Sequence, residues 1–390
     1  MQSYNFFFIY AIFFVILHPK PLIRMNSLGK NFVFTSFGES HGRAIGGVLD
    51  GVPAGVHIDM DMIRQALDRR AGRVAEDNSK FLIQNSKLPS SPRAKRETDQ
   101  VEWLSGVLDG VTLGTPIAFI IRNADARSQD YDWLKHNYRL GHADQTYQEK
   151  YGIRDHRGGG RASARETASR VVAGSIAQQL LAEQNIQISA QLIQVGTETN
   201  SEKFAQYIAD IQQQGDSIGG IVECTITGLP VGLGEPIFDK LQSHLAYAML
   251  SINACKGFEY GSGFSGVGLQ GSEMYLSNDP QLVTGGIAGG ISDGNPIVFR
   301  CVFKPTASNR KTLEALCAEV QKVQEFRSSD DNNSKFLIQN SQLPLGRHDA
   351  CVAVRAVAVV EAMAALVLQD FLSTLVQRSR SFERMRDKNS

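Results

Sequence analysis

The chain has 390 residues, of which 42% are hydrophobic and 21% charged, with 40 basic and 40 acidic side chains. This is the composition of a globular protein with a sizeable core, and the zero formal charge argues against a dedicated nucleic-acid-binding protein. The length allows one large domain or two. The five cysteines include no C-x-x-C pair, so we expect reduced, mostly buried thiols, as in a cytosolic protein.

Residues 1–24 differ from the rest of the chain. Phe6 to Leu17 is a run of twelve apolar residues, which is short for a membrane span. The run has neither the basic region nor the small-residue cleavage site of a signal peptide. Because Met25 follows directly, we interpret Met25 as the natural start and 1–24 as a non-native or leader extension. A genuine anchor or targeting segment is the alternative.

The first motif is a glycine-flanked turn. Strands are expected at Phe32–Phe34 and Ile45–Leu49, and the turn between them holds Ser40 and His41 in the sequence GESHG. A histidine in such a turn is often only an exposed side chain. Glycines on both sides would nevertheless let the imidazole approach a ligand, and imidazole is suited to proton transfer near neutral pH. His41 is therefore a candidate acid or base.

A helix is predicted at 59–70, because apolar residues recur there at helical spacing. It closes with Arg69 and Arg70, where positive charge suits the helix dipole. The structural interpretation of these arginines is this contact with the helix dipole.

One dodecamer occurs at two places, as NSKFLIQNSKLP at Asn78–Pro89 and as NSKFLIQNSQLP at Asn333–Pro344. Separated copies do not make a solenoid, which needs contiguous units. We interpret them as parts of insertions near 74–90 and 316–344, because long surface loops carry a small entropic penalty. Alternatively, a copy docks as a strand on an edge of the protein's own sheet, since FLIQN favours strands.

The central stretch, Gly141–Thr167, contains two histidines, four arginines and three consecutive glycines, but almost no aliphatic residue. Arginines suit phosphate and carboxylate oxygens, and glycines let the backbone approach a ligand closely. A helix predicted to start near Ala164 would point its N-terminus at this loop, where anions are favoured. We infer an anion site that includes His142. A mobile surface loop with solvated arginines is the alternative.

The remaining segments alternate between strands and helices. Strands are predicted at 103–107, 115–121, 186–195, 220–226 and 297–303, and helices at 236–253 and 357–375. The last helix is apolar nearly all round, so it should be buried. No strand precedes a G-x-G-x-x-G motif, so a dinucleotide-binding fold is not expected. The predicted class is α+β, a single large domain of two βαβ-like halves with antiparallel sheet.

Several motifs together resemble the chorismate synthase family. They are GESHG, GHAD-x2-Y-x2-KYG-x2-D-x-RGGGR-x-SARET, SINACKGFEYGSGF, GGIAGGIS, KPTAS and LGRHDACVAVRAVAVVEAM. The resemblance covers Gly29 to Leu375 outside the two dodecamers. It implies a chorismate synthase-like catalytic domain at 25–380, followed by a C-terminal tail at 381–390.

The resemblance also implies a reaction. Chorismate synthases eliminate phosphate and a ring proton from 5-enolpyruvylshikimate 3-phosphate to give chorismate, and they use reduced FMN without net redox change. NADPH is a candidate reductant of that flavin. The family further implies a cytoplasmic homotetramer with a small-molecule substrate, and it implies neither a nucleic-acid partner nor stable membrane association.

The matching motifs assign catalytic roles to individual residues. His41 would protonate the leaving phosphate, and His142 would stabilise or protonate the reduced flavin. Asp349 would help to remove the substrate proton. The structural alternative for Asp349 is an acid at a helix N-terminus that pairs with Arg347 or Arg355.

One further catalytic role and the binding roles are implied in the same way. Ser163 would relay protons. Substrate contacts would come from Ser40, Arg70 and Arg157. The family has a third arginine and a Pro-Gly where this chain has Ala71 and no proline, which leaves Arg70 as the better match. The implied flavin contacts are Arg161, Ala162, Ser163, Asn253, Ala254, Gly289, Lys304, Pro305, Thr306, Ala307, Ser308 and Arg347. No metal site is implied.

Two other functional classes stay open at this stage. One is a flavin oxidoreductase with net hydride transfer, which the absence of a nicotinamide-binding fingerprint disfavours. The other is a non-catalytic anion-binding protein, which would result if the insertions had damaged the site. Phosphate release from the substrate distinguishes this second class from the enzyme.

Overall fold

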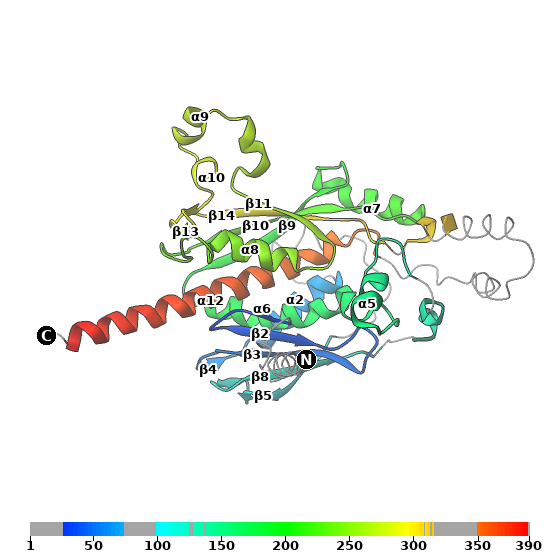
Figure 1. Cartoon of the computed structure of the whole chain (residues 1–390), viewed down its shortest axis with the longest axis horizontal. Helices are drawn as coiled ribbons and strands as arrows, with labels where there is room; N and C mark the ends of the chain where they lie inside the picture. The colour runs from blue at the N-terminus through cyan, green and yellow to red at the C-terminus, as the bar shows by residue number, and fades with distance from the viewer. Residues whose placement is uncertain are drawn as a thin grey trace, which may run out of the picture.

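Two antiparallel sheets enclose a layer of helices (Figure 1). The computed structural model describes residues 26–73, 99–124, 128–135, 138–307, 309–312, 314–315 and 349–388. The predictions for residues 1–24, for both copies of the dodecamer, for Ser308 and for Arg347 fall outside the described residues.

The first sheet has the spatial order β1-β2-β3-β8-β5, and every neighbouring pair is antiparallel. Ile117, Phe119 and Ile121 of β8 are buried, with less buried residues between them, as expected for a strand with one face on the core. The strands of this sheet and of a small neighbouring sheet (β4-β7-β6) are β1 (Ser27–Leu28), β2 (Val33–Phe37), β3 (Ala44–Asp50), β8 (Ile117–Arg122), β5 (Val101–Ser105), β4 (Ala54–His57), β7 (Val111–Leu113) and β6 (Val107–Leu108).

The second sheet has the spatial order β11-β14-β10-β9, again antiparallel throughout. Its strands are β11 (Cys255–Tyr260), β14 (Ile297–Phe303), β10 (Gly220–Thr227) and β9 (Gln187–Val195). Val222, Cys224 and Ile226 of β10 alternate with less buried residues. This sheet therefore also packs one face on the core.

Both sheets have the same connectivity. In each, the strands stand in the order first, second, fourth, third along the chain, as β2-β3-β8-β5 and as β9-β10-β14-β11. A helix lies between the second and third strands, α2 (Met60–Ala71) or α8 (Leu241–Leu250). Another helix follows the fourth strand, α6 (Thr167–Ala182) or α12 (Ala353–Lys388). The predicted α+β fold with two halves is confirmed.

The helices α6 and α12 pack against each other between the sheets (Figure 1). A Cβ on Gly174 of α6 would lie 2.4 Å from Ala362 of α12, so this glycine permits the close crossing of the helices. By length and composition Ala353–Leu375 could cross a membrane, but 89% of its most apolar window is buried inside the fold. It is the core helix that its all-round apolar sequence predicts.

Several helix assignments differ from the predictions, and helix α7 (Phe204–Gln213) was not predicted at all. Helix α8 starts at Leu241, because residues 235–239 form a turn closed by a backbone hydrogen bond of 3.0 Å. Helix α12 continues to Lys388, through most of the segment predicted as a tail. Helix α5 (Asp144–Tyr151) lies inside the central stretch. It is mostly polar, so no apolar periodicity revealed it.

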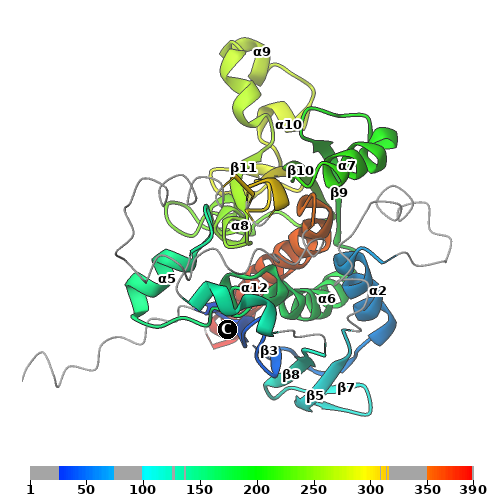
Figure 2. The same ribbon diagram turned by 90° about the vertical axis from the view of Figure 1, so that its right-hand side faces the viewer.

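The other elements are short. They are η1 (Ser128–Lys135), η2 (Gly160–Ala162), η3 (Ala164–Glu166), η4 (Ser201–Lys203), α7 (Phe204–Gln213), η5 (Gly263–Gly268), α9 (Gly271–Tyr275), α10 (Pro280–Val283), β12 (Ile287–Ala288) and β13 (Ile291–Ser292). The segment of residues 261–286, with η5, α9 and α10, protrudes beyond the second sheet at the upper left of Figure 1, and α5 lies to the right of α6 and α2. Figure 2 views the molecule from the right-hand side of Figure 1, with α5 towards the viewer.

Candidate functional site

The turn between β2 and β3 buries its two central side chains. Ser40 is 1% exposed and His41 4% exposed, so the interpretation of an exposed hairpin tip is wrong. Ser40 Oγ lies 3.3 Å from His41 Nδ1, and the Tyr131 ring meets the imidazole edge-on at a centroid distance of 4.8 Å. The side-chain amide of Asn123 donates to two carbonyl oxygens of the turn, at 2.9 and 3.1 Å, and its oxygen accepts from Arg165 Nε at 2.9 Å. These contacts fix the histidine against the central loop.

The glycine triplet lies between the two predicted histidines. Gly158, Gly159 and Gly160 have φ angles of +61°, +87° and +53°, which glycine adopts without strain. A Cβ on Gly158 would lie 1.9 Å from His41 Nδ1, and one on Gly159 would lie 3.0 Å from His142 Cε1. Each of these two glycines therefore leaves room for one imidazole, and the loop brings His41 and His142 to the same site.

Asp144 is a functional candidate that the sequence patterns missed. Its buried carboxylate accepts from Arg139 Nε at 2.8 Å and from Arg139 Nη2 at 2.9 Å, and it lies 2.9 Å from His142 Nδ1. Arg154 Nη1 is 3.7 Å away. Burial alone would raise the pKa of Asp144, but the hydrogen bonds and charges of Arg139 and His142 outweigh it and hold the pKa far below its ordinary value. The only sequence signal was an acid two residues after His142.

Arg70 lies beneath the loop. It is 1% exposed, and it donates to Thr167 Oγ1 at 2.9 Å and to the carbonyl oxygen of Ala164 at 2.7 Å. Arg70 and Arg165 both pair with the buried Asp99, at 3.5 and 2.5 Å. Burial would raise the pKa of Asp99, but the two guanidinium groups lower it below its ordinary value. This supporting position differs from the direct substrate contact implied for Arg70.

The two remaining arginines of the loop lie nearer the surface. Arg161 donates to the carbonyl oxygen of Gly38 at 3.1 Å and to Ser36 Oγ at 2.5 Å, which joins the loop to β2. Arg157 forms a two-pronged pair with Asp155, at 2.8 and 2.9 Å, and its side chain is 42% exposed. Arg157 is thus the more accessible of the two predicted substrate arginines.

Hydrogen bonds connect several predicted flavin residues in a chain. Asn253 Nδ2 donates to the carbonyl oxygen of Ala162 at 3.1 Å. The carbonyl oxygen of Ala254 accepts from the backbone N–H of Lys304 at 3.0 Å. Lys304 Nζ donates to the carbonyl oxygen of Gly141 at 2.7 Å. Segments from both halves therefore meet at the central loop, and Pro305 and Ala307 follow Lys304 there.

Asp349 joins the same cluster from the start of α12. Its backbone carbonyl accepts from Thr306 Oγ1 at 2.9 Å, and its carboxylate pairs with Arg355 Nη1 at 2.8 Å. Arg355 Nε donates to the carbonyl oxygen of Arg70 at 3.1 Å. The ion pair with Arg355, which was the structural alternative for Asp349, is therefore present. Because Arg355 also contacts Arg70, the pair places Asp349 close to the arginine that lies beneath the central loop.

Two predicted residues occupy other positions. Ser163 Oγ accepts from the backbone N–H of Arg165 at 3.3 Å and caps η3. Gly289 lies in the β12–β13 hairpin, whose Gly290 accepts from the backbone N–H of Leu241 at the start of α8. Asn253 follows the far end of that helix, about 15 Å away along its axis. Gly289 therefore lies about a helix length from Asn253, at the other end of α8.

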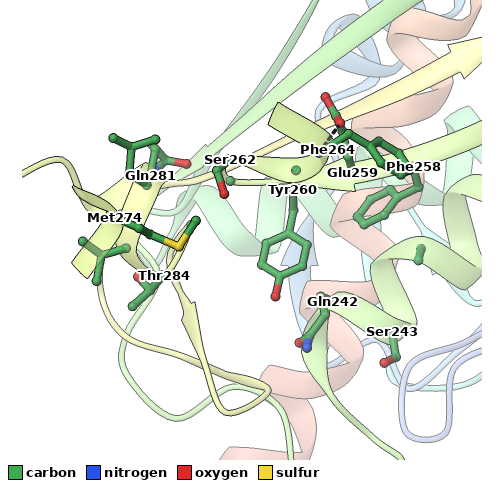
Figure 3. A pocket seen from close by; sticks show the side chains of 16 residues that line it. Gln242, Ser243, Phe258, Glu259, Tyr260, Ser262, Phe264, Met274, Gln281 and Thr284 are labelled. Carbon is green, nitrogen blue, oxygen red and sulfur yellow. Dashed lines mark hydrogen bonds between the residues drawn. The ribbon is translucent and has the colours of Figure 1, made fainter. Parts of the chain in front are cut away.

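A hollow of about 530 Å³ lies elsewhere, between α8, β11 and the protruding segment (Figure 3). Phe258, Tyr260 and Met274 line it, and the Tyr260 hydroxyl points towards Gln242 (Figure 3). None of the residues predicted to bind substrate or flavin lines this hollow. The cluster around the glycine triplet is therefore the candidate functional site.

Comparison with known proteins extends over both halves. The sequence model of the chorismate synthase family matches residues 32–373. The chorismate synthase of Flavobacterium psychrophilum is 44% identical over 378 residues, covering 89% of this chain and 96% of the relative. That of Christiangramia forsetii is 46% identical over 375 residues, covering 89% and 97%. A crystal structure of chorismate synthase covers 93% of this chain and 98% of its own, with a TM-score of 0.64 and 26% identity.

Proposed function

Because the chain belongs to the chorismate synthase family, we propose that its active site is the cluster around the glycine triplet. The chain is an enzyme, a lyase of the shikimate pathway in aromatic amino acid biosynthesis. It eliminates phosphate and a ring proton from 5-enolpyruvylshikimate 3-phosphate to give chorismate. The proposed location of the site rests on one observation, that Gly158 and Gly159 bring His41 and His142 together.

We propose reduced FMN as the cofactor, held by residues 161–163, by Asn253 and Ala254, and by residues 304–308 with Arg347. Asn253 Oδ1 is buried, and no hydrogen-bond donor in the described part of the chain reaches it. A buried acceptor without a donor is unfavourable, so a ligand that donates there would fit. Ala254 has a φ of +67°, and such strain is typical of ligand sites. When bound, reduced FMN supplies an electron-rich ring beside the substrate, without net redox change.

His41 is proposed as the acid that protonates the departing phosphate. Burial excludes competing water from its imidazole, and the contacts with Ser40 and Tyr131 hold the ring in place. Arg157 is proposed to bind the anionic groups of the substrate, because its guanidinium is partly exposed. The buried Ser40 and Arg70 are proposed to support these contacts from beneath the loop.

His142 and Asp349 are proposed to act on the other side of the reaction. His142 would stabilise the reduced cofactor, and Asp349 would help to accept the substrate proton, with Ser163 as a relay. The pair with Arg355 fixes the orientation of the Asp349 carboxylate. The support for these roles is the match of the sequence motifs together with the contacts that join the residues to one loop.

We also propose a cytoplasmic homotetramer without stable membrane association. Cys224, Cys301 and Cys351 are buried and unpaired, which suits a reducing compartment. The protruding segment exposes Phe264, Val267 and Leu276 by 80%, 93% and 82%, and exposed apolar residues of this kind often mark subunit contacts. NADPH as the reductant of the flavin is supported only by the family.

The test is anaerobic turnover with and without reduced FMN. We expect chorismate and phosphate to form in equal amounts, at a steady rate and only with reduced FMN. Release of phosphate without FMN would contradict the proposed cofactor. Binding of substrate without phosphate release would indicate an anion-binding protein, and oxidation of NADPH without chorismate would indicate a flavin oxidoreductase.

A further inference from the structure

The carboxylate of Asp144 joins the imidazole of His142 to a fixed arginine. Oδ2 accepts from the backbone N–H of Arg139 at 3.1 Å and from its Nε at 2.8 Å, and Oδ1 accepts from Nη2 at 2.9 Å. Oδ1 also lies 2.9 Å from His142 Nδ1. Asp144 is 3% exposed. Arg139 therefore fixes both oxygens of a buried carboxylate that faces the histidine.

The hydrogen-bonding capacity of the carboxylate decides which ring nitrogen carries the proton. The arginine contacts keep Asp144 ionised, as the lowered pKa indicates, and an ionised carboxylate can only accept. His142 Nδ1 must then be a donor. Arg139 Nη2 is 3.2 Å from the same nitrogen, but both would be donors there, so the Nη2 hydrogen bond goes to Asp144. In the neutral ring Nε2 is left as the acceptor.

The loop lies against this second nitrogen. A Cβ on Gly159 would be 3.1 Å from His142 Nε2, so Nε2 is the nitrogen that faces the glycine triplet. We propose that Asp144 is a positioning residue for the reaction, which holds the Nδ1–H tautomer of His142 and presents Nε2 to the site. This inference rests on the proposed function of His142, and Asp144 itself need not touch the substrate or the flavin.

The Asp144→Asn variant tests the proposal, because an amide can donate to Nδ1 and so favour the other tautomer. We expect kcat to fall about 10- to 100-fold, the scale for losing a group that orients a functional histidine. KM and the affinity for FMN, measured by flavin fluorescence, should change little. The matched control is Asp370→Asn, another buried carboxylate, which accepts from the backbone N–H groups of residues 30–32 at the start of the first sheet. It should lower the unfolding midpoint and leave kcat unchanged.

A double-mutant cycle separates positioning from a general structural effect. In a His142→Ala background, Asp144→Asn should lower kcat by less than about twofold further, because coupled residues are not additive. An undiminished loss in that background would overturn the proposal, as would full kcat in the single variant or a change confined to KM. If Asp144→Asn does not fold, Arg139→Lys keeps the charge but loses the two-pronged contact, and the same cycle applies to it.

Failure of the proposed function gives a different result. If His142→Ala alone kept full activity, the role of His142 would be wrong and the positioning role would be overturned with it. If the wild-type chain made chorismate and His142→Ala were impaired while Asp144→Asn were not, only the positioning role would be wrong.

Discussion

In the first half of the molecule a turn of residues 38–43 joins the first two strands, whereas in the second half residues 196–219, including α7, make the equivalent connection. The short turn carries His41 and packs on the glycine triplet. The long connection carries no histidine, and it contributes supporting contacts: the Ser217 hydroxyl donates to the carbonyl oxygen of Thr306 at 2.8 Å, and the backbone N–H of Ile218 donates to that of Ala350 at 2.7 Å. The two halves therefore share one strand connectivity, but their equivalent connections do not carry equivalent functional residues.

The connections after the fourth strand are more alike. In the first half this connection holds His142 and the glycine triplet, and in the second half it holds Lys304 and Asp349. Because α6 and α12 pack together, the two connections meet, and Lys304 Nζ bonds the carbonyl oxygen of Gly141. The comparison teaches that the duplicated topology fixes where a site can form, while the loops decide which half supplies acids, bases or binding groups.

The largest expected effect tests whether the two functional histidines belong to the first half. His41→Ala and His142→Ala should each lower kcat by about 10²–10⁴, the scale of a lost general acid, while FMN binding survives better than turnover. The control is His244→Ala in the second half, which removes a histidine that contacts Asp239 and Phe371 near the surface. Stopped-flow or steady-state formation of chorismate measures the effect. Full activity in either first-half variant would remove the assigned role.

A smaller effect is expected from substituting Gly158, the glycine that packs against His41. Gly158→Ala would place its Cβ 1.9 Å from His41 Nδ1, so the imidazole must move. A misplacement of about 1 Å costs about 10²-fold in rate. Gly55→Ala is the matched control, because Gly55 has a φ of +84° but no atom within 4 Å of the added Cβ. If both variants lost activity equally, backbone strain and not the histidine contact would be the cause.

The buried ion pairs of the first half should contribute more to the free energy of unfolding than the partly exposed ion pair of the second sheet. Asp99→Asn leaves Arg70 and Arg165 buried with no charge from that side chain, which should cost about 3–5 kcal/mol in the free energy of unfolding. Glu223→Gln removes a partly exposed pair with Arg300 and should cost at most about 1 kcal/mol. Urea unfolding at pH 7 measures both. Equal costs would contradict the comparison.

The Asp99 pair also predicts a pH dependence. The folded pKa of Asp99 lies below its unfolded value of 3.8, so its contribution is complete above that value and is lost as the pH falls through the depressed folded pKa. The difference in unfolding free energy between wild type and Asp99→Asn should therefore shrink below about pH 4. A difference that stays constant down to pH 2 would show that the carboxylate charge is not its origin.

The smallest effects are expected from the two dodecamers, of which each half contains one. Deleting Asn78–Pro89 should leave activity nearly unchanged, because its position follows α2 and no motif residue adjoins it. Deleting Asn333–Pro344 should change turnover modestly, because Arg347 and Asp349 follow closely. Circular dichroism and turnover of both deletions are the measurements. Loss of folding in either would favour a docked structural strand over an insertion.

Local sequence determined most of the core strands and helices and several of their ends. The range predicted for the strand at 297–303 coincides with β14, because alternating apolar residues are a local property of a chain with one buried face. Helix α2 begins after Asp59, whose carboxylate accepts from two N–H groups of the first turn, and it ends before Gly72 in the left-handed region. Motifs also singled out His41, His142 and the glycine triplet, which the fold brings together in the candidate site, because each lies in a distinctive run of residues.

The contacts that organise the site were decided by the tertiary structure. Asp99 is 66 residues from Arg165 in sequence and lies in no motif, so only the packing of α2 and the start of α6 reveals it. The sequence predicted that Arg70 would be available to bind an anion, but Arg70 is buried beneath the loop. The sequence also grouped Gly289 with Asn253, but the length of helix α8 separates them. Sequence patterns record each residue's own backbone and burial preference. Which charges face each other depends on how the two halves pack, and no local period carries that information.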